Sequence, residues 1–280
     1  MAATREEQRL PTMAAYDRWA ATYDSDGNIM QMLDDIFIGK HLPPLIQDAS
    51  SPHPQTVVVD LGCGTGRNTL KLARLGATVV AVDNSVGMVR RLREKLAQDE
   101  DATLAQRVTV VMQDLSAFPA GDLLPALSTL PPHSETSDVA TTGQNDVNAD
   151  ATASTDIKKV DGVVSTLVLE HLSLKTFFAV AAAILKPQGW LLLTNMHADI
   201  GACTSAGFVD PVTGNKVRPV SINHTEEDIL SVARTHGFAL DGAVSEDGVR
   251  DEAHAAKLGP RALKWVGYKM HLGMLLRLDG

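Results

Sequence analysis

The chain has 280 residues, of which 44% are hydrophobic, and a formal net charge of −9 at pH 7. This length predicts one domain (residues 1–280) with insertions, and the acidic balance argues against a nucleic-acid partner. No apolar run approaches the roughly 18 residues of a membrane span. Two cysteines give neither a disulfide framework nor a metal site, and the charged N-terminus is not a secretory signal, so we expect a cytoplasmic protein.

The N-terminal segment predicts a mobile tail over residues 1–11 and then helices over 12–46. Three aromatic residues fall within eight positions here, although Phe, Tyr and Trp total only 12 in the chain. They are Tyr16, Trp19 and Tyr23, at helical spacing. Either this helix simply docks in a groove or it is a lid over a site. The stretches 30–38 and 42–46 are predicted to continue as helix, with a break at Pro43-Pro44.

The stretch VVVDLGCGTGRNTLKL, residues 57–72, predicts a buried strand, a glycine turn and a helix N-terminus. In such a turn, bare backbone can lie against a ligand and backbone N–H groups can face it. The glycine spacing is G-x-G-x-G rather than the dinucleotide pattern G-x-G-x-x-G, because Arg67 stands where the third dinucleotide glycine would fall.

With Asp60 ahead of the glycines, this stretch resembles motif I of class I S-adenosylmethionine-dependent methyltransferases, D/E-x-G-x-G-x-G. The segment YDRWAATYD, residues 16–24, is similar to the N-terminal lid of ubiquinone- and menaquinone-type (methyltransferase type 11) small-molecule enzymes. The resemblance implies that Trp19 faces an acceptor. It also implies cofactor contacts from the lid and the turn: Tyr16, Tyr23, Asp60, Gly62, Gly64, Gly66 and Asn68.

The next two predicted strands, residues 77–82 and 107–112, each end at an aspartate. Asp83 lies 19 positions beyond Gly64 and is placed to accept hydrogen bonds from a ribose diol, although a strand-end aspartate could also be a helix cap. In the family that the chain resembles, Asp114 would accept from the adenine amine, again with capping as the alternative. Neighbouring cofactor contacts are then expected from Asn84, Met88 and Leu115.

Residues 119–157 are rich in Pro, Ser, Thr, Asp and Ala and show no periodicity, which predicts a disordered insertion with a short helix around Leu123 and Leu127. A fourth strand, 160–165, follows, and the resemblance places Thr166 and Leu167 at the cofactor. The dipeptide Glu170-His171 invites a catalytic interpretation, but it is read as a helix opening.

A fifth strand, 190–194, leads to His197. Open parallel sheets bind ligands at the carboxyl ends of their strands, so His197 is the first candidate for a base or acceptor-orienting group, and His224 is the second. His224 can also be a loop residue before a helix capped by Thr225. The stretch 198–223 is expected to form a substrate-side loop, with Phe208 touching the acceptor.

Two more strands, 238–244 and 265–276, complete the element order that the resemblance implies. It is a Rossmann-like α/β fold with a seven-stranded, mostly parallel sheet of order 3-2-1-4-5-7-6, strand 7 antiparallel. The expected activity is methyl transfer from S-adenosylmethionine, which leaves S-adenosylhomocysteine, to O, N or S of a small molecule such as a secondary metabolite. We expect no metal, and a monomer or weak homodimer.

Two other functions remain open at this stage. A non-catalytic regulator that binds the same cofactor would keep the glycine turn and Asp83 without turnover. A nicotinamide-dependent oxidoreductase is disfavoured by Arg67 and by Asp60 ahead of the glycines.

Overall fold

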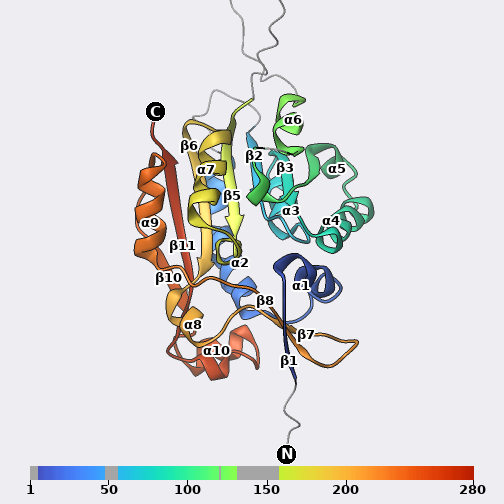
Figure 1. The fold of residues 1–280 in the computed structure, drawn as a ribbon, viewed down its shortest axis with the longest axis vertical. Coiled ribbons are helices and arrows are strands. Elements are labelled where there is room, and N and C mark those ends of the chain that lie inside the picture. Colours follow the sequence, from blue (N-terminus) through green and yellow to red (C-terminus); the bar gives the residue numbers. More distant parts are fainter. Residues whose placement is uncertain (1–5, 48–55, 120, 131–157) are drawn as a thin grey trace, which may run out of the picture.

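A computed structural model describes residues 6–47, 56–119, 121–130 and 158–280. The main sheet has the order β10-β11-β6-β5-β2-β3-β4, and β9 also pairs with β11 (Figure 1). Its parallel strands are β2 (Val57–Leu61), β3 (Thr78–Asp83), β4 (Val108–Met112), β5 (Val160–Thr166) and β6 (Leu185–Met196). Antiparallel to their partners run β9 (Phe238–Leu240), β10 (Ser245–Gly248) and β11 (Lys269–Leu278). The predicted Rossmann-like α/β class is confirmed.

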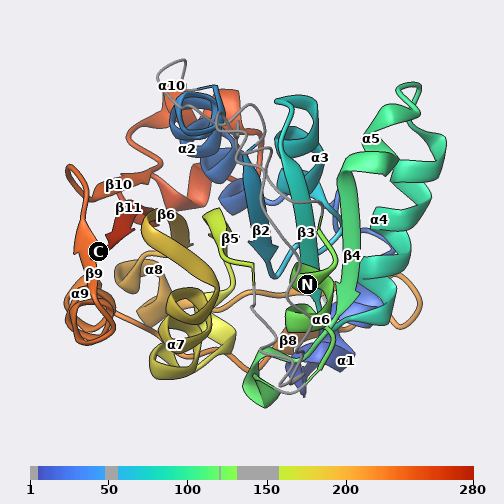
Figure 2. The same cartoon turned by 90° about the horizontal axis from the view of Figure 1, so that it is seen from above.

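Helices cover both faces of this sheet (Figure 2), which explains why the central strands are continuously apolar. One face packs on α2 (Ile29–Ile46), α3 (Arg67–Arg74), α4 (Val86–Gln98) and α5 (Thr103–Arg107). The other packs on α6 (Leu123–Ser128), α7 (Leu174–Ile184) and α9 (Glu226–Thr235). All five residues of β2 are buried between the two layers.

The antiparallel end of the sheet differs from the prediction of seven strands. Of the predicted strand 238–244, only Phe238–Leu240 form a strand, β9, whereas β10 begins at Ser245; both strands pair with β11. Leu276 faces Leu240 of β9, whereas Gly273 faces Ser245 of β10. The ten-residue β11 is long enough for two short neighbours, so the main sheet has eight strands among the residues that the structure describes.

A second sheet, absent from the prediction, joins the N-terminal segment to the region after β6. Strand β1 (Glu7–Leu10) pairs in parallel with β8 (Lys216–Pro219), and β7 (Phe208–Val209) pairs antiparallel with β8. Residues 7–10 are therefore a paired strand and not part of a mobile tail. This sheet holds α1 (Thr12–Trp19) close to the carboxyl ends of β2 to β5 (Figure 1).

The predicted lid over residues 12–46 consists of two different parts. Helix α1 and the turn up to residue 28 lie at the edge of the sheet, while α2 packs along one face of it. Helix α2 also continues through Pro43 and Pro44, so the predicted break is wrong. The prolines lie in the last turn, so only the carbonyls four residues earlier, those of Gly39 and Lys40, lose their helical N–H partners.

Helix α2 is fixed by Asp34, which is fully buried. Its carboxylate pairs with Arg67 and accepts hydrogen bonds from Thr194 Oγ1 at 2.6 Å and His271 Nε2 at 3.2 Å. Although burial opposes ionisation, these donors hold the pKa of Asp34 at about 2. The charge pairing joins α2 to α3, β6 and β11.

Part of the segment 119–157, predicted to be a disordered insertion, belongs to the core. Residues 121–130 contain α6, and Leu123, Leu127 and Leu130 are buried against the sheet. The remainder of that segment, 131–157, lies outside the described residues. The predicted substrate-side stretch 198–223 contains α8 (Ala198–Cys203), β7 and β8.

Candidate functional site

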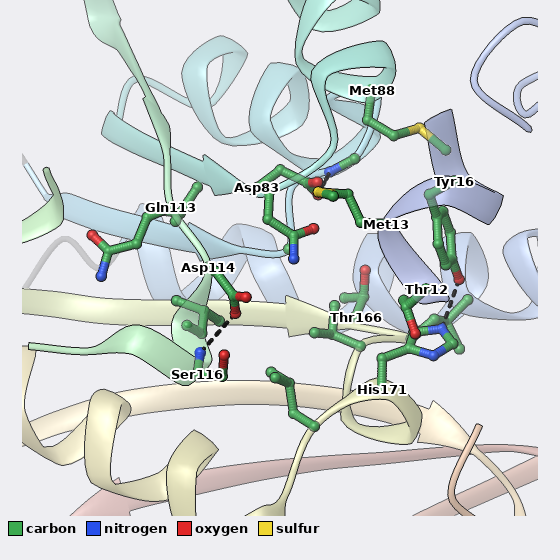
Figure 3. Close-up of a pocket in the computed structure, with 18 of the residues that line it drawn as sticks. Thr12, Met13, Tyr16, Asp83, Met88, Gln113, Asp114, Ser116, Thr166 and His171 are labelled. Atoms are coloured by element: carbon green, nitrogen blue, oxygen red, sulfur yellow. Dashed lines mark hydrogen bonds between the residues drawn. The ribbon is translucent and has the colours of Figure 1, made fainter. Parts of the chain in front are cut away.

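A cavity of about 310 Å³, the first cavity, opens at the carboxyl ends of the parallel strands. Figure 3 shows Asp114 and Ser116 at one end of it and Tyr16 and His171 at the other, with Asp83 between them. The carboxyl edge is where open parallel sheets bind ligands, because the loops there leave adjacent strands in different directions.

Most of the predicted cofactor residues line this cavity. They come from the lid, the glycine turn and the ends of β3, β4 and β5: Tyr16, Tyr23, Gly62, Gly64, Asp83, Asn84, Met88, Asp114, Leu115, Thr166 and Leu167. The sequence analysis missed several others, among them Thr12, Met13, Gln113 and His171. Because His171 was read only as a helix opening, its place in the wall is a correction.

Asp60, Gly66 and Asn68 do not line the cavity. Asp60 is buried behind the turn, where it accepts a hydrogen bond from Thr69 Oγ1 at 2.6 Å, and burial raises its pKa to about 6. A Cβ on Gly66 would lie 2.3 Å from Leu92 Cδ1, so this glycine permits close packing of α3 against α4. Asn68 donates to Thr166 Oγ1 at 2.9 Å and thereby supports a lining residue.

The backbone of the glycine turn is satisfied within the protein. The N–H groups of Gly62 and Cys63 both donate to Val82 O, at 2.8 and 2.9 Å. Gly64 N donates to Asp83 Oδ2 at 2.8 Å. The expected row of N–H groups facing a ligand is therefore not formed. Instead, Gly64 has positive φ and open space where a Cβ would stand, so a ligand can rest on its backbone.

Asp83 couples the turn to β3. Its Oδ1 accepts from Ser85 N at 2.8 Å, opposite the bond from Gly64 to Oδ2. Burial raises the pKa of Asp83, while these backbone donors oppose the rise. At the other end of the cavity, Asp114 Oδ1 accepts a hydrogen bond from Ser116 N at 2.9 Å and thereby caps a 3-10 turn. Asp114 also lines the first cavity.

Tyr16 and His171 form a hydrogen-bonded pair in the wall (Figure 3), with Tyr16 Oη 2.8 Å from His171 Nε2. His171 Nδ1 lies 2.9 Å from Val220 O, and because a carbonyl only accepts, Nδ1 carries the proton. Burial lowers the pKa of His171 to about 4, so the ring is neutral and its Nε2 accepts the tyrosine O–H. The Tyr16 oxygen keeps lone pairs for another donor.

The lid, residues 12–28, is tied to the body of the domain by two aspartates. Asp17 Oδ1 accepts from Ser85 Oγ at 2.6 Å and from Gly87 N at 2.9 Å. Asp24 accepts from Thr65 Oγ1 at 2.7 Å and pairs with Lys95 at 2.8 Å. These contacts hold the aromatic residues of α1 against the first cavity.

A second cavity of about 120 Å³ adjoins the first. Tyr16, Tyr23 and Leu167 line both cavities. The rest of its wall comes from the start of α2, the end of β6, the region 200–216 and the segment 261–270. A molecule in the second cavity would therefore meet one in the first across a shared wall.

Glu170 is the buried acid of the second cavity. It lies in the 3-10 turn η2 (Leu169–His171) and is 4% exposed. The Ser221 hydroxyl favours its ionised form, and among the described residues its Oε2 has no hydrogen-bond partner of standard geometry. Burial raises the pKa of Glu170 to about 7. A carboxyl with that pKa and an open oxygen can exchange a proton near neutral pH. The dipeptide Glu170-His171 was the signal in the sequence that pointed to it.

The two histidines predicted to be catalytic lie elsewhere. His197 Nε2 is 2.8 Å from Glu246 Oε1, and its Nδ1 caps α8 by accepting from Asp199 N at 3.1 Å. His224 Nε2 is 3.2 Å from both Leu169 O and Leu172 O. Neither lines either cavity, and both are held by structural hydrogen bonds. We therefore correct their assignment to positioning of the local backbone.

Of the aromatic residues Trp19 and Phe208, which were predicted to contact the acceptor, only Trp19 lines a cavity. Trp19 lines the second cavity, and its Nε1 donates to Asp26 Oδ2 at 2.8 Å. Phe208 lies in neither wall but stacks on Trp19, with ring centroids 5.1 Å apart. Phe208 thus supports the cavity from behind.

The described residues contain neither a metal-binding cluster nor a membrane-spanning helix. No group of three or more His, Cys, Asp or Glu side chains there could hold a metal ion. No helix in the same ranges is long and apolar enough to cross a membrane.

The sheet, the glycine turn and the acidic residues after β3 and β4 define a methyltransferase of the class I fold. The family model described as "Methyltransferase domain" matches residues 58–128. "Uncharacterized methyltransferase AN0656" of Emericella nidulans is 37% identical over 285 residues, covering 95% of this chain and 90% of the relative. The chain therefore belongs to this methyltransferase family, which removes the nicotinamide oxidoreductase alternative.

Solved structures show the same fold at low identity. A putative S-adenosylmethionine dependent methyltransferase from Listeria monocytogenes aligns with TM-score 0.54 and 17% identity, over 89% of this chain and 100% of that one. Magnesium protoporphyrin IX methyltransferase from Synechocystis, with bound SAH, also gives TM-score 0.54 and 17% identity, over 96% and 95%. The predicted class, a methyltransferase of the fold whose members use S-adenosylmethionine, is confirmed.

Proposed function

We propose that the protein transfers a methyl group from S-adenosylmethionine in the first cavity to O, N or S of a small molecule in the second. The observation that carries this proposal is the wall of Tyr16, Tyr23 and Leu167 common to both cavities. Because these residues border both cavities, a donor in the first and an acceptor in the second would lie next to each other at this border. Such alignment of two reactants can lower the activation barrier by roughly 7–11 kcal/mol. The enclosed second cavity favours a small acceptor.

The residues of the first cavity suit a nucleoside. The Asp83 carboxylate can accept from a ribose diol, and Asp114 has an oxygen for the exocyclic amine of adenine, which only donates. Met88 and Leu115 supply an apolar wall for the base. When bound, S-adenosylmethionine supplies a methyl group that its positively charged sulfur already activates.

Glu170 then acts as the proton acceptor in place of the predicted histidines. When the acceptor is methylated, its nucleophilic atom would lose an O–H, N–H or S–H proton, and Glu170 Oε2 would accept that proton. The open Oε2 and its burial in the second cavity support this role. Tyr16, fixed by His171, orients the nucleophile through its free lone pairs.

Calorimetry with S-adenosylhomocysteine and a labelled-methyl assay on fractionated metabolite extracts test the proposal. We expect binding of the product and label transferred to a low-molecular-weight fraction. Failure to bind S-adenosylhomocysteine would reject the donor site. Binding without transfer to any fraction would instead support the alternative of a cofactor-binding regulator.

A further inference from the structure

Three basic side chains line the second cavity together with Glu170. Lys216 comes from β8, and Arg261 and Lys264 come from the segment between α10 (Glu252–Leu258) and the end of the 3-10 turn η3 (Leu263–Trp265). Lys216 is half-buried, whereas Arg261 and Lys264 are exposed. The exposed pair marks the mouth of the cavity.

Unlike several other basic residues, these three cations form no ion pair in the described part of the chain. Lys71, Lys95 and Lys269 each pair with a carboxylate, in a chain that carries 34 acidic and 25 basic residues. Among the residues that the structure describes, no carboxylate forms an ion pair with any of the three cations in the second cavity. Other exposed lysines, such as Lys40, Lys175 and Lys257, also form no ion pair in the described ranges, but they lie on separate helices, whereas these three cations line one cavity.

The surroundings confirm that positive charge accumulates at this wall. Burial lowers the pKa of Lys216, and the nearby charges of Arg218, Lys264 and Arg261 lower it further, whereas Glu7 opposes them. Arg261 donates to the backbone carbonyl of Asp26, and Lys264 Nζ lies 4.6 Å from the Trp265 ring centroid. Arg261 also lowers the pKa of the Asp26 carboxyl, so that carboxylate balances part of its charge, as Glu7 does for Lys216. Lys264 has only the aromatic ring, so an anion would relieve the remaining repulsion.

We propose that the second cavity selects acceptors that carry an anionic oxygen group, a carboxylate or a phosphate, bound by Lys216, Arg261 and Lys264. The inference rests on the proposed function for the assignment of this cavity to the acceptor. The anionic group lies at the mouth, and the methylated atom lies at the inner wall between Glu170 and the first cavity. The apolar side chains of Ile200 and Met270 enclose the body of the molecule between them.

The test uses three probes of similar size: benzoate, phenyl phosphate and benzamide. Each is titrated into the full-length protein loaded with S-adenosylhomocysteine, and binding is followed by ligand-observed NMR. We expect benzoate, phenyl phosphate or both to bind about tenfold more tightly than neutral benzamide, and the affinity to fall with added salt. The two anions distinguish a carboxylate site from a phosphate site.

A triple variant locates the binding. In Lys216→Gln/Arg261→Gln/Lys264→Gln, the advantage of the anions over benzamide is expected to disappear, while the Kd of S-adenosylhomocysteine is unchanged. The single variant Lys264→Gln, at an exposed position, repeats the test with little risk to folding.

The matched control removes the same charge at three exposed lysines outside both cavities, Lys40, Lys175 and Lys257. This variant should keep the preference for anions. Equal binding of benzoate and benzamide by the wild-type protein, or an equal loss in the control variant, would overturn the inference. Neither result would contradict the proposed donor site. That site is tested separately by the binding of S-adenosylhomocysteine to the same sample.

Discussion

The first cavity takes its glycine turn and its aspartates from the ends of parallel strands, with Gly62 after β2, Asp83 at the end of β3 and Asp114 after β4. The second cavity takes its charged residues from places far apart in the chain: Glu170 after β5, Lys216 in β8 and Arg261 after α10. Hydrogen bonding between strands fixes the relative positions of the first set. The second set depends on how loops and short elements pack on the sheet edge, so its specificity can change while the sheet stays intact.

The largest expected effect is on turnover and comes from a change in the second cavity. Glu170→Gln removes the proton acceptor of the second cavity, so kcat should fall by about 10²–10⁴ if the acceptor must lose a proton. The Kd of S-adenosylhomocysteine should stay near the wild-type value. In the wild type, kcat/KM should decrease below pH of about 7, because the carboxyl becomes protonated.

The control is Glu227→Gln, at an exposed position in α9, which should leave both quantities unchanged. If Glu170→Gln, assayed with the identified acceptor, has the kcat of the wild type, Glu170 is not the proton acceptor.

The converse effect should come from Asp83→Ala. Loss of the hydrogen bonds to the ribose is expected to weaken S-adenosylhomocysteine binding about 10²-fold, as measured by calorimetry. Asp122→Ala is the control, because Asp122 is exposed and its side chain caps nothing. Equal affinities in Asp83→Ala and the wild type would contradict the placement of the ribose.

Tyr16 lies in the wall that the cavities share, so Tyr16→Phe should affect both at once. Without the O–H donated to His171, we expect kcat/KM to fall by about fivefold to tenfold, with a smaller rise in the Kd of S-adenosylhomocysteine. Tyr268→Phe, which keeps its ring contact with Trp265, is the control. A change confined to one of the two quantities would show that Tyr16 serves only one cavity.

The smallest expected effect is on stability. The pKa of Glu170 is about 7 in the folded protein and about 4.5 when exposed, so folding binds a proton between these values. The free energy of unfolding should therefore fall as pH rises from about 4.5 to about 7, and Glu170→Gln should abolish that part of the fall. The variant should have a higher Tm than wild type at pH of about 8 and a similar Tm at about 5. Parallel Tm profiles would contradict the burial of this carboxyl.

The sequence by itself determined the class of the fold and most of the first cavity. Apolar runs separated by caps and glycines identify strands and helices, and in a parallel sheet each strand end arrives at the same edge. The spacing of Gly62, Gly64 and Asp83 therefore predicted that these residues lie together at one edge of the sheet. Even there, Asp60 and Asn68 were misplaced, because a motif does not say which of its polar residues turn into the core.

Only the tertiary structure decided the second cavity. His197 follows a strand at the correct edge, yet Glu246 and the end of α8 engage its ring. Lys216 reaches the site because β8 pairs with β1 across 209 positions of the chain, as in the register of Glu7 with Lys216. Such pairings between distant short strands leave no local pattern, since they are set by packing and hydrogen bonds that exist only once the domain has folded.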